Sequence, residues 1–238
     1  MIHVYEMFGP TIQGEGPHAG MKTMFLRVAG CSFKCSWCDS KYAWDTTSAE
    51  HYREDELAEK LVQLCLNNKT YNLIITGGNP CIYDFSYIID RLHDNDITVD
   101  VETQGDLYPD WLTKVDLLVI SPKGPSSGMP DVYEKLEDWL HSSGMQNPVC
   151  IKIPVFNEDD FMFVRRYYDL VIRNRHAGKN IELYLSVGNT NTSEEGDISP
   201  RVLSDYAKLI DMVSKSDLKR VFVLPQIHTL IWGNKSGV

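Results

Sequence analysis

Short apolar runs alternate with helix-like segments along most of the chain. The apolar runs are rich in β-branched residues, which is typical of buried strands, and they occupy residues 23–28, 72–76, 98–102, 117–121, 149–155, 182–186 and 220–224. Between them, apolar residues recur every three or four positions, which predicts helices over residues 54–66, 86–92, 132–139, 160–172 and 202–213. Asn157 stands where it can cap the fourth of these helices.

This alternation of strands and helices indicates a parallel sheet with helices outside it. The chain is short for a complete eight-fold barrel, so we expect one α/β domain over residues 1–238, with an incomplete (β/α) barrel of about six or seven mostly parallel strands. A doubly wound open sheet is the alternative topology. In barrels the chemistry lies at the carboxyl ends of the strands. Unusual residues follow four predicted strands here, at positions 31–38, 76–80, 102–105 and 121–123.

Composition and charge narrow the class of protein. The chain has 238 residues, of which 43% are hydrophobic and 24% charged, as in soluble globular proteins. No stretch approaches the roughly 18 apolar residues of a membrane span, and residues 1–10 lack the pattern of a signal peptide, so we expect a cytoplasmic protein. A formal charge of −10 argues against a nucleic-acid-binding surface, because phosphate contacts need clustered Lys and Arg.

Three cysteines, Cys31, Cys35 and Cys38, share one short segment. Such a segment cannot disperse three thiols into a core, so their sulfurs can converge on one metal centre as thiolates. Three soft ligands without an obvious fourth suit an iron–sulfur cluster that keeps one iron free of protein. Zinc is the rival, with a fourth ligand from His51 or a distant residue, and a disulfide with a spare thiol is the remaining alternative.

Other single residues stand out by their position. Cys65 and Cys150 lie in apolar patterns, where we expect them to pack as small buried hydrophobes. Arg27 lies within an apolar strand, and a buried Arg requires an anionic partner, either a substrate carboxylate or an internal Asp. Gly77 and Gly78 follow a strand, where they permit close approach of the backbone to a ligand or simply form a turn.

The Cys-x3-Cys-x2-Cys spacing, with Trp37 just before the last Cys, resembles the signature of the radical S-adenosylmethionine (SAM) superfamily. The resemblance implies a barrel of the radical SAM type in which Cys31, Cys35 and Cys38 hold a 4Fe-4S cluster. It further implies that the open iron binds SAM, and that an electron from the cluster splits SAM into methionine and a 5′-deoxyadenosyl radical.

Further segments, at residues 8–16, 38–40, 102–105, 121–123 and 225–238, together resemble the 7-carboxy-7-deazaguanine synthases. The resemblance runs from end to end and is closest to the form found in Bacillus-like bacteria. Those enzymes rearrange 6-carboxy-5,6,7,8-tetrahydropterin into 7-carboxy-7-deazaguanine and expel ammonia, on the route to queuosine and related 7-deazapurines. The implied course is removal of a hydrogen from C6, ring contraction and regeneration of SAM.

The same resemblance implies roles for residues outside the cysteine triplet. Magnesium is implied at the hydroxyl of Ser40. SAM is implied to contact Trp37, Asp39, Gly78, Asn79, Ser121, Pro122 and Lys123. The pterin is implied to contact Ile12, Gln13, Gly14, Glu15, Arg27, Thr76, His228 and Val238. Asn79 departs from the Gly-Gly-Glu-Pro motif common in the superfamily, so a carbonyl of its side chain or backbone would have to receive the ammonium of SAM.

Several of these residues also have ordinary structural explanations. Glu15 would otherwise be a solvated loop carboxylate, Ser40 a turn cap, and His228 a satisfied core histidine. The apolar tail around Trp232 should prefer burial, which would bring the terminal carboxylate over the barrel mouth.

Two other functions compete with the synthase. An activase that places a glycyl radical on a partner enzyme would share the cysteine triplet but would not need the loop of Gln13 and Glu15. A zinc-stabilised binding module is the non-enzymatic alternative. For a synthase, the expected partners are a pterin substrate, an electron donor such as flavodoxin or ferredoxin, and a second copy in a homodimer, with neither nucleic acid nor membrane.

Overall fold

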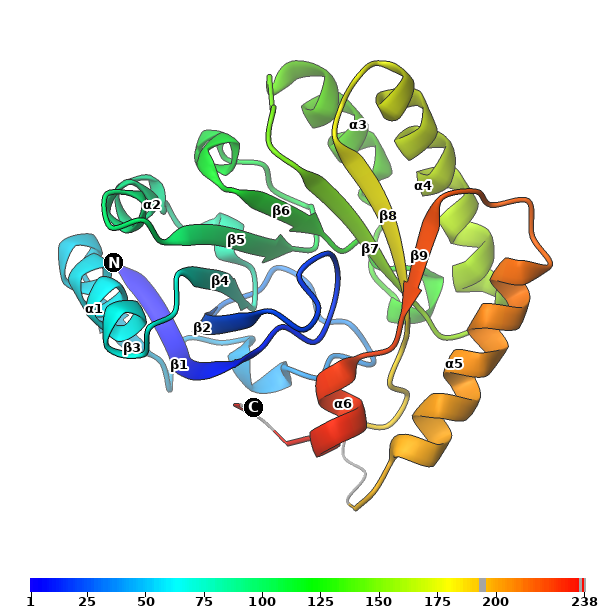
Figure 1. The fold of residues 1–238 in the computed structure, drawn as a ribbon, viewed down its shortest axis with the longest axis horizontal. Helices are drawn as coiled ribbons and strands as arrows, with labels where there is room; N and C mark the ends of the chain where they lie inside the picture. Colours follow the sequence, from blue (N-terminus) through cyan, green and yellow to red (C-terminus); the bar gives the residue numbers. More distant parts are fainter. Residues whose placement is uncertain (193–195, 236, 238) are drawn as a thin grey trace.

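The computed structural model of the chain describes residues 1–192, 196–235 and 237. In this part of the chain one sheet contains nine strands, and their order across the sheet is β3 (Glu50–Tyr52), β1 (Ile2–Ile12), β2 (Lys22–Val28), β4 (Asn72–Gly77), β5 (Thr98–Thr103), β6 (Leu117–Ile120), β7 (Val149–Val155), β8 (Ile181–Val187) and β9 (Val221–Leu224). Figure 1 shows that the sheet curves into an open barrel whose two ends do not meet.

The seven strands that the apolar runs predict are all present, and they are the seven that pair in parallel, β2 and β4 to β9. Neighbours in this part of the sheet follow one another along the chain, and their order never reverses. The topology is therefore singly wound, which excludes the doubly wound alternative. The incomplete barrel of mostly parallel strands is confirmed.

The sequence-based prediction missed the two antiparallel strands, β1 and β3. β1 pairs with β2 and, on its other side, with β3. Its register with β2 shifts between Val4 and Glu6 and again between Phe8 and Thr11, and Gly9-Pro10 lies within the second shift. A Gly-Pro pair inside a strand resembles a turn in the sequence, and a three-residue strand such as β3 carries too little pattern to detect.

The predicted helices are present as α1 (Glu54–Asn67), α2 (Ser86–His93), α3 (Tyr133–Ser142), α4 (Glu158–His176) and α5 (Ser199–Ser214). Asn157 caps α4, since its side chain accepts a hydrogen bond from the backbone N–H of Asp160 at 3.0 Å, as predicted. Elements that were not predicted are α6 (Ile227–Trp232) and the short 3-10 helices η1 (Lys41–Ala43), η2 (Pro80–Ile82), η3 (Asp110–Lys114) and η4 (Pro125–Ser127).

Strand alternation sorts the residues between two sides of the sheet. On β7, Ile151 and Ile153 join the main core beneath the helices, whereas Cys150 packs in a smaller cluster on the other side, which includes Tyr184. Lys152, two residues after Cys150, therefore also points into the barrel. Cys65 and Cys150 are fully buried, so their predicted core packing is confirmed.

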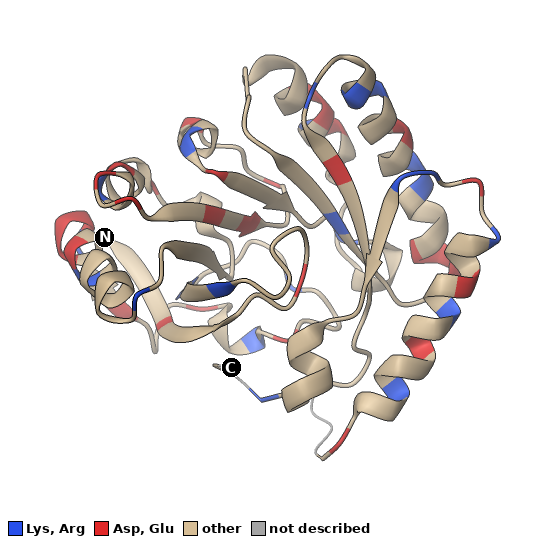
Figure 2. Ribbon diagram, in the orientation of Figure 1, with Lys and Arg blue, Asp and Glu red and all other residues tan. Residues whose placement is uncertain are grey.

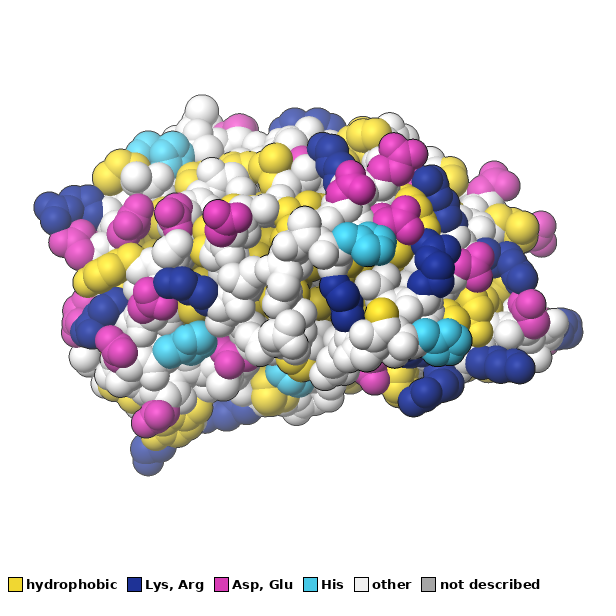
Figure 3. All heavy atoms as spheres, turned by 90° about the horizontal axis from the view of Figure 1, so that it is seen from above, with side chains coloured by type: hydrophobic (Ala, Val, Ile, Leu, Met, Phe, Trp, Pro, Cys, Tyr) yellow, Lys and Arg dark blue, Asp and Glu magenta, His cyan; other side chains and the backbone are white. Residues whose placement is uncertain are grey.

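Charged residues are more frequent on the helices that surround the barrel than on its strands. Figure 2 shows acidic and basic positions alternating along α4 and α5, and a few charged positions on the strands themselves. On the face shown in Figure 3, acidic and basic side chains are interspersed among hydrophobic and histidine side chains. Within the described residues, no helix combines the length and the apolar character needed to cross a membrane.

Candidate active site

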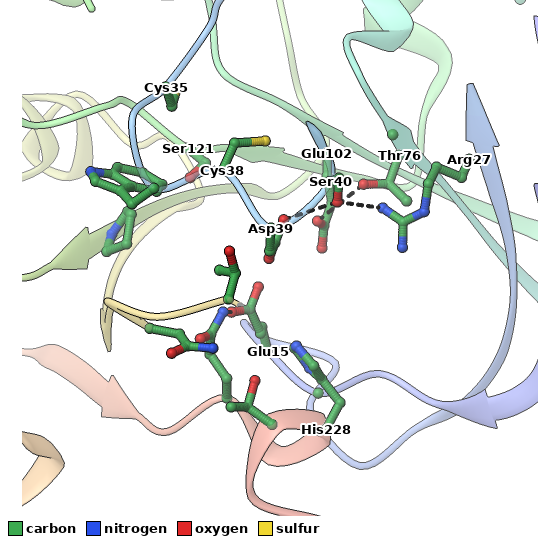
Figure 4. Close-up of a pocket in the computed structure, with 18 of the residues that line it drawn as sticks. Glu15, Arg27, Cys35, Cys38, Asp39, Ser40, Thr76, Glu102, Ser121 and His228 are labelled. Carbon is green, nitrogen blue, oxygen red and sulfur yellow. Dashed lines mark hydrogen bonds between the residues drawn. The ribbon is translucent and has the colours of Figure 1, made fainter. Parts of the chain in front are cut away.

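A cavity of about 520 Å³ opens at the carboxyl ends of the parallel strands. Figure 4 shows Cys35 and Cys38 on one side of it, Arg27 on another, and Glu15 and His228 on the wall below. Most of the site residues predicted from the sequence line this cavity, namely Ile12, Gln13, Gly14, Glu15, Arg27, Cys31, Cys35, Trp37, Cys38, Asp39, Ser40, Thr76, Gly78, Ser121, Lys123 and His228. Asn79 and Pro122 are not among the lining residues, and Val238 lies outside the described residues.

The cysteine loop follows β2 and is held from outside by the segment around η4. The backbone N–H of Ser36 donates to the carbonyl of Ser127 at 3.0 Å, and the indole Nε1 of Trp37 donates to Ser126 Oγ at 2.9 Å. The Trp37 ring also stacks on Phe156, with centroids 4.4 Å apart. These contacts fix the turn of the loop, so that all three thiols face the same cavity.

The thiols of this loop fit a shared cluster. Cys31 and Cys38 are half-buried and Cys35 is buried, and all six cysteines of the chain are free of disulfides. Burial raises the pKa of each of the three thiols, that of Cys35 to about 11. A cationic cluster would reverse this, because metal ligation stabilises thiolates. His51, the fourth ligand considered for zinc, instead stacks on His3 between β1 and β3.

A second segment, at the end of β4, meets the cysteine loop backbone to backbone. The N–H of Gly78 donates to the carbonyl of Val28 at 2.9 Å, and the N–H of Asn79 donates to the carbonyl of Gly30 at 2.8 Å. A Cβ on Gly78 would collide with the Gly30 carbonyl, so the glycine is needed for this approach. The glycine pair thus permits a close contact between two backbone segments and also lines the cavity, while its contact with a ligand stays a prediction.

Asn79, a predicted SAM contact, does not line the cavity. Its side chain is completely buried, where its carbonyl accepts from the backbone N–H of Cys81 and from Thr103 Oγ1, and its amide donates to Asp106 Oδ1 at 2.7 Å. The side-chain carbonyl already has two donors, so it does not reach the cavity. A contact of Asn79 with SAM would therefore have to come from its backbone.

Arg27 has an internal partner, although not the Asp that the sequence suggested. Its Nε donates to Glu6 Oε1 at 2.7 Å, and its Nη1 donates to Ser40 Oγ at 3.1 Å. Ser40 Oγ in turn donates to Asp39 Oδ1 at 2.9 Å. Ser40 precedes η1, but its hydroxyl makes no capping bond there. The hydroxyl instead links Arg27 to Asp39 at the edge of the cavity.

The deepest charged group is a set of three residues, Glu15, Glu102 and Lys152, called the carboxylate cluster below. The ammonium of Lys152 hydrogen-bonds to Glu15 and lies 3.5 Å from Glu102 Oε2. Gln226 Nε2 donates to Glu15 Oε1 at 2.6 Å, and Gln13 Nε2 donates to Glu102 Oε1 at 3.0 Å. Burial acts to raise the pKa of Glu15, but Lys152, together with His228 and Gln226, outweighs burial and brings that pKa to about 2. Glu15 is therefore an ionised, partnered carboxylate, not a solvated one.

Lys152, Glu102 and Gln226 are site residues that were not predicted from the sequence. Lys152 had a detectable signal, since it is the single charged residue of an apolar strand, the same signal that drew attention to Arg27. Glu102 stands in a recognised segment, but nothing in its spacing indicates its partners. Gln226 lies 211 residues from Glu15 along the chain, and only the closed fold brings the two together.

The C-terminal segment forms the remaining wall. His228 lies on α6, not at the end of the last strand, and a Cβ on Gly14 would collide with its ring. The N–H of Ile227 donates to the carbonyl of Gly14 at 3.0 Å, so α6 docks directly on the loop after β1. Gly237 also lines the cavity, which agrees with a tail that returns to the barrel mouth.

Known proteins share both the sequence and the fold of this chain. Residues 26–126 match the model of the Radical SAM superfamily. The chain is 40% identical to 7-carboxy-7-deazaguanine synthase of Bacillus subtilis, covering 100% of this chain and 98% of the relative. It is 35% identical to the synthase of Bacillus cereus, covering 100% and 99% of the two chains.

Two solved structures carry the same fold at lower identity. QueE from Escherichia coli superposes with a TM-score of 0.68 at 21% identity, over 95% of this chain and 94% of that one. Native anSMEcpe with bound AdoMet gives a TM-score of 0.53 at 19% identity, over 87% and 65%. Full-length identity of 40%, the radical SAM match and the open barrel lead to one assignment: this chain belongs to the 7-carboxy-7-deazaguanine synthase family of radical SAM enzymes.

Proposed function

We propose that this chain converts 6-carboxy-5,6,7,8-tetrahydropterin into 7-carboxy-7-deazaguanine with release of ammonia, a step toward queuosine and related 7-deazapurines. The observation that carries the proposal is the polarity of one cavity, which has three thiols on one side, the Arg27 guanidinium on another, and the carboxylate cluster below. A carboxylated pterin has the complementary polarity, since it offers an anionic carboxylate and an edge of N–H donors.

Family membership brings a 4Fe-4S cluster and SAM as cofactors, which removes the zinc and disulfide alternatives. Cys31, Cys35 and Cys38 would hold the cluster, which supplies the electron that cleaves SAM to a carbon radical. For SAM we propose contacts with the lining residues Trp37, Asp39, Gly78, Ser121 and Lys123. Asn79 and Pro122 would act through the backbone of their loops.

For the pterin we propose three anchoring groups. Arg27 is half-buried and fixed by Glu6, so its remaining donors can bind the substrate carboxylate without a further change of rotamer. Glu15 accepts from the N–H donors of the guanidine-like edge, and Gln13 lies beside it. The terminal carboxylate of Val238 would accept from the same edge. Ile12, Gly14, Thr76 and His228 complete the proposed substrate contacts.

Magnesium is proposed at Ser40. The hydroxyl of Ser40 lies at the cavity edge between Arg27 and Asp39, where an oxygen ligand is accessible. Magnesium often takes few protein ligands and completes its shell with water and substrate oxygens. The pterin carboxylate, drawn to Arg27, would supply such an oxygen.

A small-molecule substrate and an electron donor are consistent with a radical SAM enzyme of this family. We propose a flavodoxin or ferredoxin as that donor, a homodimer as the working form, and the cytoplasm as its location, with no part for nucleic acid. Residues 1–238 would act as one radical SAM domain, in which the loop after β1 and the C-terminal tail bind substrate.

Anaerobic turnover tests the proposal. The purified protein, reconstituted with iron and sulfide, should be brown and should convert the carboxy-tetrahydropterin to 7-carboxy-7-deazaguanine in the presence of SAM, magnesium and a reductant, as followed by mass spectrometry. Cleavage of SAM with the pterin recovered unchanged would contradict the proposal. A glycyl radical on a partner enzyme would point to an activase instead.

A further inference from the structure

Lys152 has no part in the activity proposed above, yet it is the most enclosed charge of the pocket. Its side chain is only 8% exposed, and its two carboxylate neighbours, Glu15 and Glu102, are 14% and 20% exposed. Strand alternation on β7 turns it inward beside Cys150, away from the helices. Burial of a charged Lys is costly unless an opposite charge pairs with it, so the partners of Lys152 indicate its role.

Those partners are two carboxylates that approach the same ammonium from different elements. Glu15 stands on the loop after β1, Glu102 on β5, and Lys152 on β7, so the cation joins three separate parts of the barrel. The cluster carries two negative charges and one positive charge. Its excess negative charge favours a ligand edge made of N–H donors.

Without the cation, the two carboxylates would be neighbours in a poorly hydrated site. Two such groups cannot both ionise easily, and together they retain a proton to a higher pH than either would alone. A protonated Glu15 would present an O–H donor where the pterin also presents donors. The cation therefore acts together with His228 and the Gln226 amide to keep Glu15 an acceptor at neutral pH.

Lys152 itself stays charged. Burial acts to lower its pKa, but Glu102 and Glu15 outweigh burial and hold that pKa well above its ordinary value. The other titratable groups near the cluster are Cys150 on β7, Lys123 after β6, Glu182 on β8 and His228 on α6. A lysine held so firmly as a cation does not exchange protons during turnover, so its contribution is positional and electrostatic.

We infer that Lys152 is a positioning residue that holds Glu15 and Glu102 together as an ionised pair facing the N–H edge of the substrate, and that it thereby keeps pterin binding independent of pH near neutrality. The inference rests on the proposed function, because the ligand edge is that of the pterin. It concerns a residue that neither donates a proton to the substrate nor touches the cysteine loop.

The test compares the reconstituted wild-type enzyme with Lys152→Met, which keeps the length of the side chain and removes its charge. KM for the carboxy-tetrahydropterin should rise on the order of ten- to a hundredfold at about pH 6.5. The rise should shrink toward about pH 8.5, where the unpaired carboxylates ionise again. The wild-type KM should change little over the same range, and the cluster absorbance should be equal in both.

Two further variants separate this role from simple loss of packing. Lys152→Arg should restore most of the wild-type KM, because it returns the cation. Lys152→Met combined with Glu102→Gln should bind the pterin more tightly than Lys152→Met alone, because the double variant removes one carboxylate together with the cation and leaves Glu15 without a like-charged neighbour. A purely structural role for Lys152 predicts that the double variant is no better than the single one.

The outcomes are distinct. If Lys152→Met, or Lys152→Gln should the methionine variant fail to fold, shows the wild-type KM and pH profile, or if Glu102→Gln gives no rescue of the raised KM, the inference is wrong and the proposed function stands. If the wild-type enzyme itself neither binds nor converts the pterin, the proposed function fails first. Lys208→Met, on the exposed face of α5, is the matched control and should behave as wild type.

Discussion

Two cations that face the pocket, Arg27 and Lys152, determine which end of a ligand each side of the pocket can bind. Each is the single basic residue at the inner face of an otherwise apolar strand, and each is paired with a glutamate from another element. Arg27 keeps donors available for an anion, whereas the charge of Lys152 is balanced by Glu15 and Glu102. A substrate with one anionic end and one donor-rich edge can therefore enter in a single orientation.

Removal of any one of the three cysteine thiols tests the cluster assignment. Replacement of Cys31, Cys35 or Cys38 with Ala should abolish both the visible iron–sulfur absorbance and turnover, because three thiolates are the minimum protein ligation of such a cluster. The measurement is iron and sulfide content together with the absorption spectrum. Cys65→Ala, in the buried face of α1, is the control and should keep both properties. Normal cluster content in the Cys35→Ala variant would exclude Cys35 as a ligand of the cluster.

The Ser40 hydroxyl offers a separate test of the magnesium site. Ser40→Ala removes the oxygen that lies between Arg27 and Asp39, so activity at limiting magnesium should fall while saturating magnesium restores much of it. The cluster absorbance should stay unchanged. Ser36→Ala, on the same loop but bonded outward to Ser126, should leave the magnesium response intact. Equal magnesium titrations of Ser40→Ala and wild type would remove Ser40 from the site.

Single residues were predictable from the sequence where a motif or an isolated charge marked them. The cysteine triplet, Arg27 and Glu15 all line the cavity, as expected. Lys152 carried the same kind of mark as Arg27 and was missed. The partners of these residues could not be predicted from any spacing along the chain. Glu6 meets Arg27 across the antiparallel pair of β1 and β2, whereas Glu102 and Gln226 are brought to Lys152 and Glu15 by the curvature of the whole barrel.

At the scale of elements, buried parallel strands were predictable and edge structure was not. A strand covered on its outer face by helices has a continuous apolar pattern, which is why all seven parallel strands were found. β1 and β3 lie at the open edge, where the pattern weakens, and β1 is interrupted by register shifts. The six-residue helix α6 is held mainly by docking on the loop after β1, a contact that no local pattern encodes.

The loop between β1 and β2 is fastened inside the barrel by an ion pair, which gives a pH prediction. His18 Nδ1 lies 2.6 Å from Asp100 Oδ2 on β5. That hydrogen bond raises the pKa of His18 above 6.5, whereas burial raises the pKa of Asp100. A raised histidine pKa stabilises the fold fully below about pH 6.5, and this stabilisation is lost as the pH rises through the pKa of the folded state.

His18→Gln should therefore destabilise the protein more at about pH 6 than at about pH 8.5. Because His18 is partly exposed, we expect a difference of only about 0.5–1 kcal/mol in the free energy of unfolding, measured by denaturant titration at each pH. Asp100→Asn should remove the same pH dependence, since it takes away the partner. A constant gap between wild type and His18→Gln across this range would show that the pair does not act as an ionic lock.

At the scale of the whole molecule, two segments near the ends of the chain, the loop after β1 and helix α6, join each other where the sheet is open. Figure 1 shows helix α6 at the gap between the two ends of the sheet and the loop after β1 reaching into the middle of the barrel. The bonds from Gln226 to Glu15 and from Ile227 to Gly14 join them. The barrel fold was predictable from the sequence, but this closure was foreseen only as a packed tail.

Shortening of the tail tests its proposed contact with the substrate. Deletion of residues 237 and 238 removes the terminal carboxylate from its expected place over the pterin. Loss of one charge-assisted bond, about 1.5–3 kcal/mol, should raise KM for the pterin roughly ten- to a hundredfold. SAM cleavage in the absence of pterin should stay intact, and it serves as the internal control. Unchanged pterin affinity in the shortened enzyme would show that the tail covers the cavity without binding the substrate.

The bond between Glu15 and Gln226 also sets an order of events during synthesis of the protein. The two residues are 211 positions apart, so at about 5–20 residues per second the ribosome needs roughly 10–40 s to make the second after the first. For most of this interval the cysteine loop exists without the wall that α6 later provides. We expect the nascent chain to expose its thiols to the cell's cluster-assembly machinery before the last elements emerge and cover them.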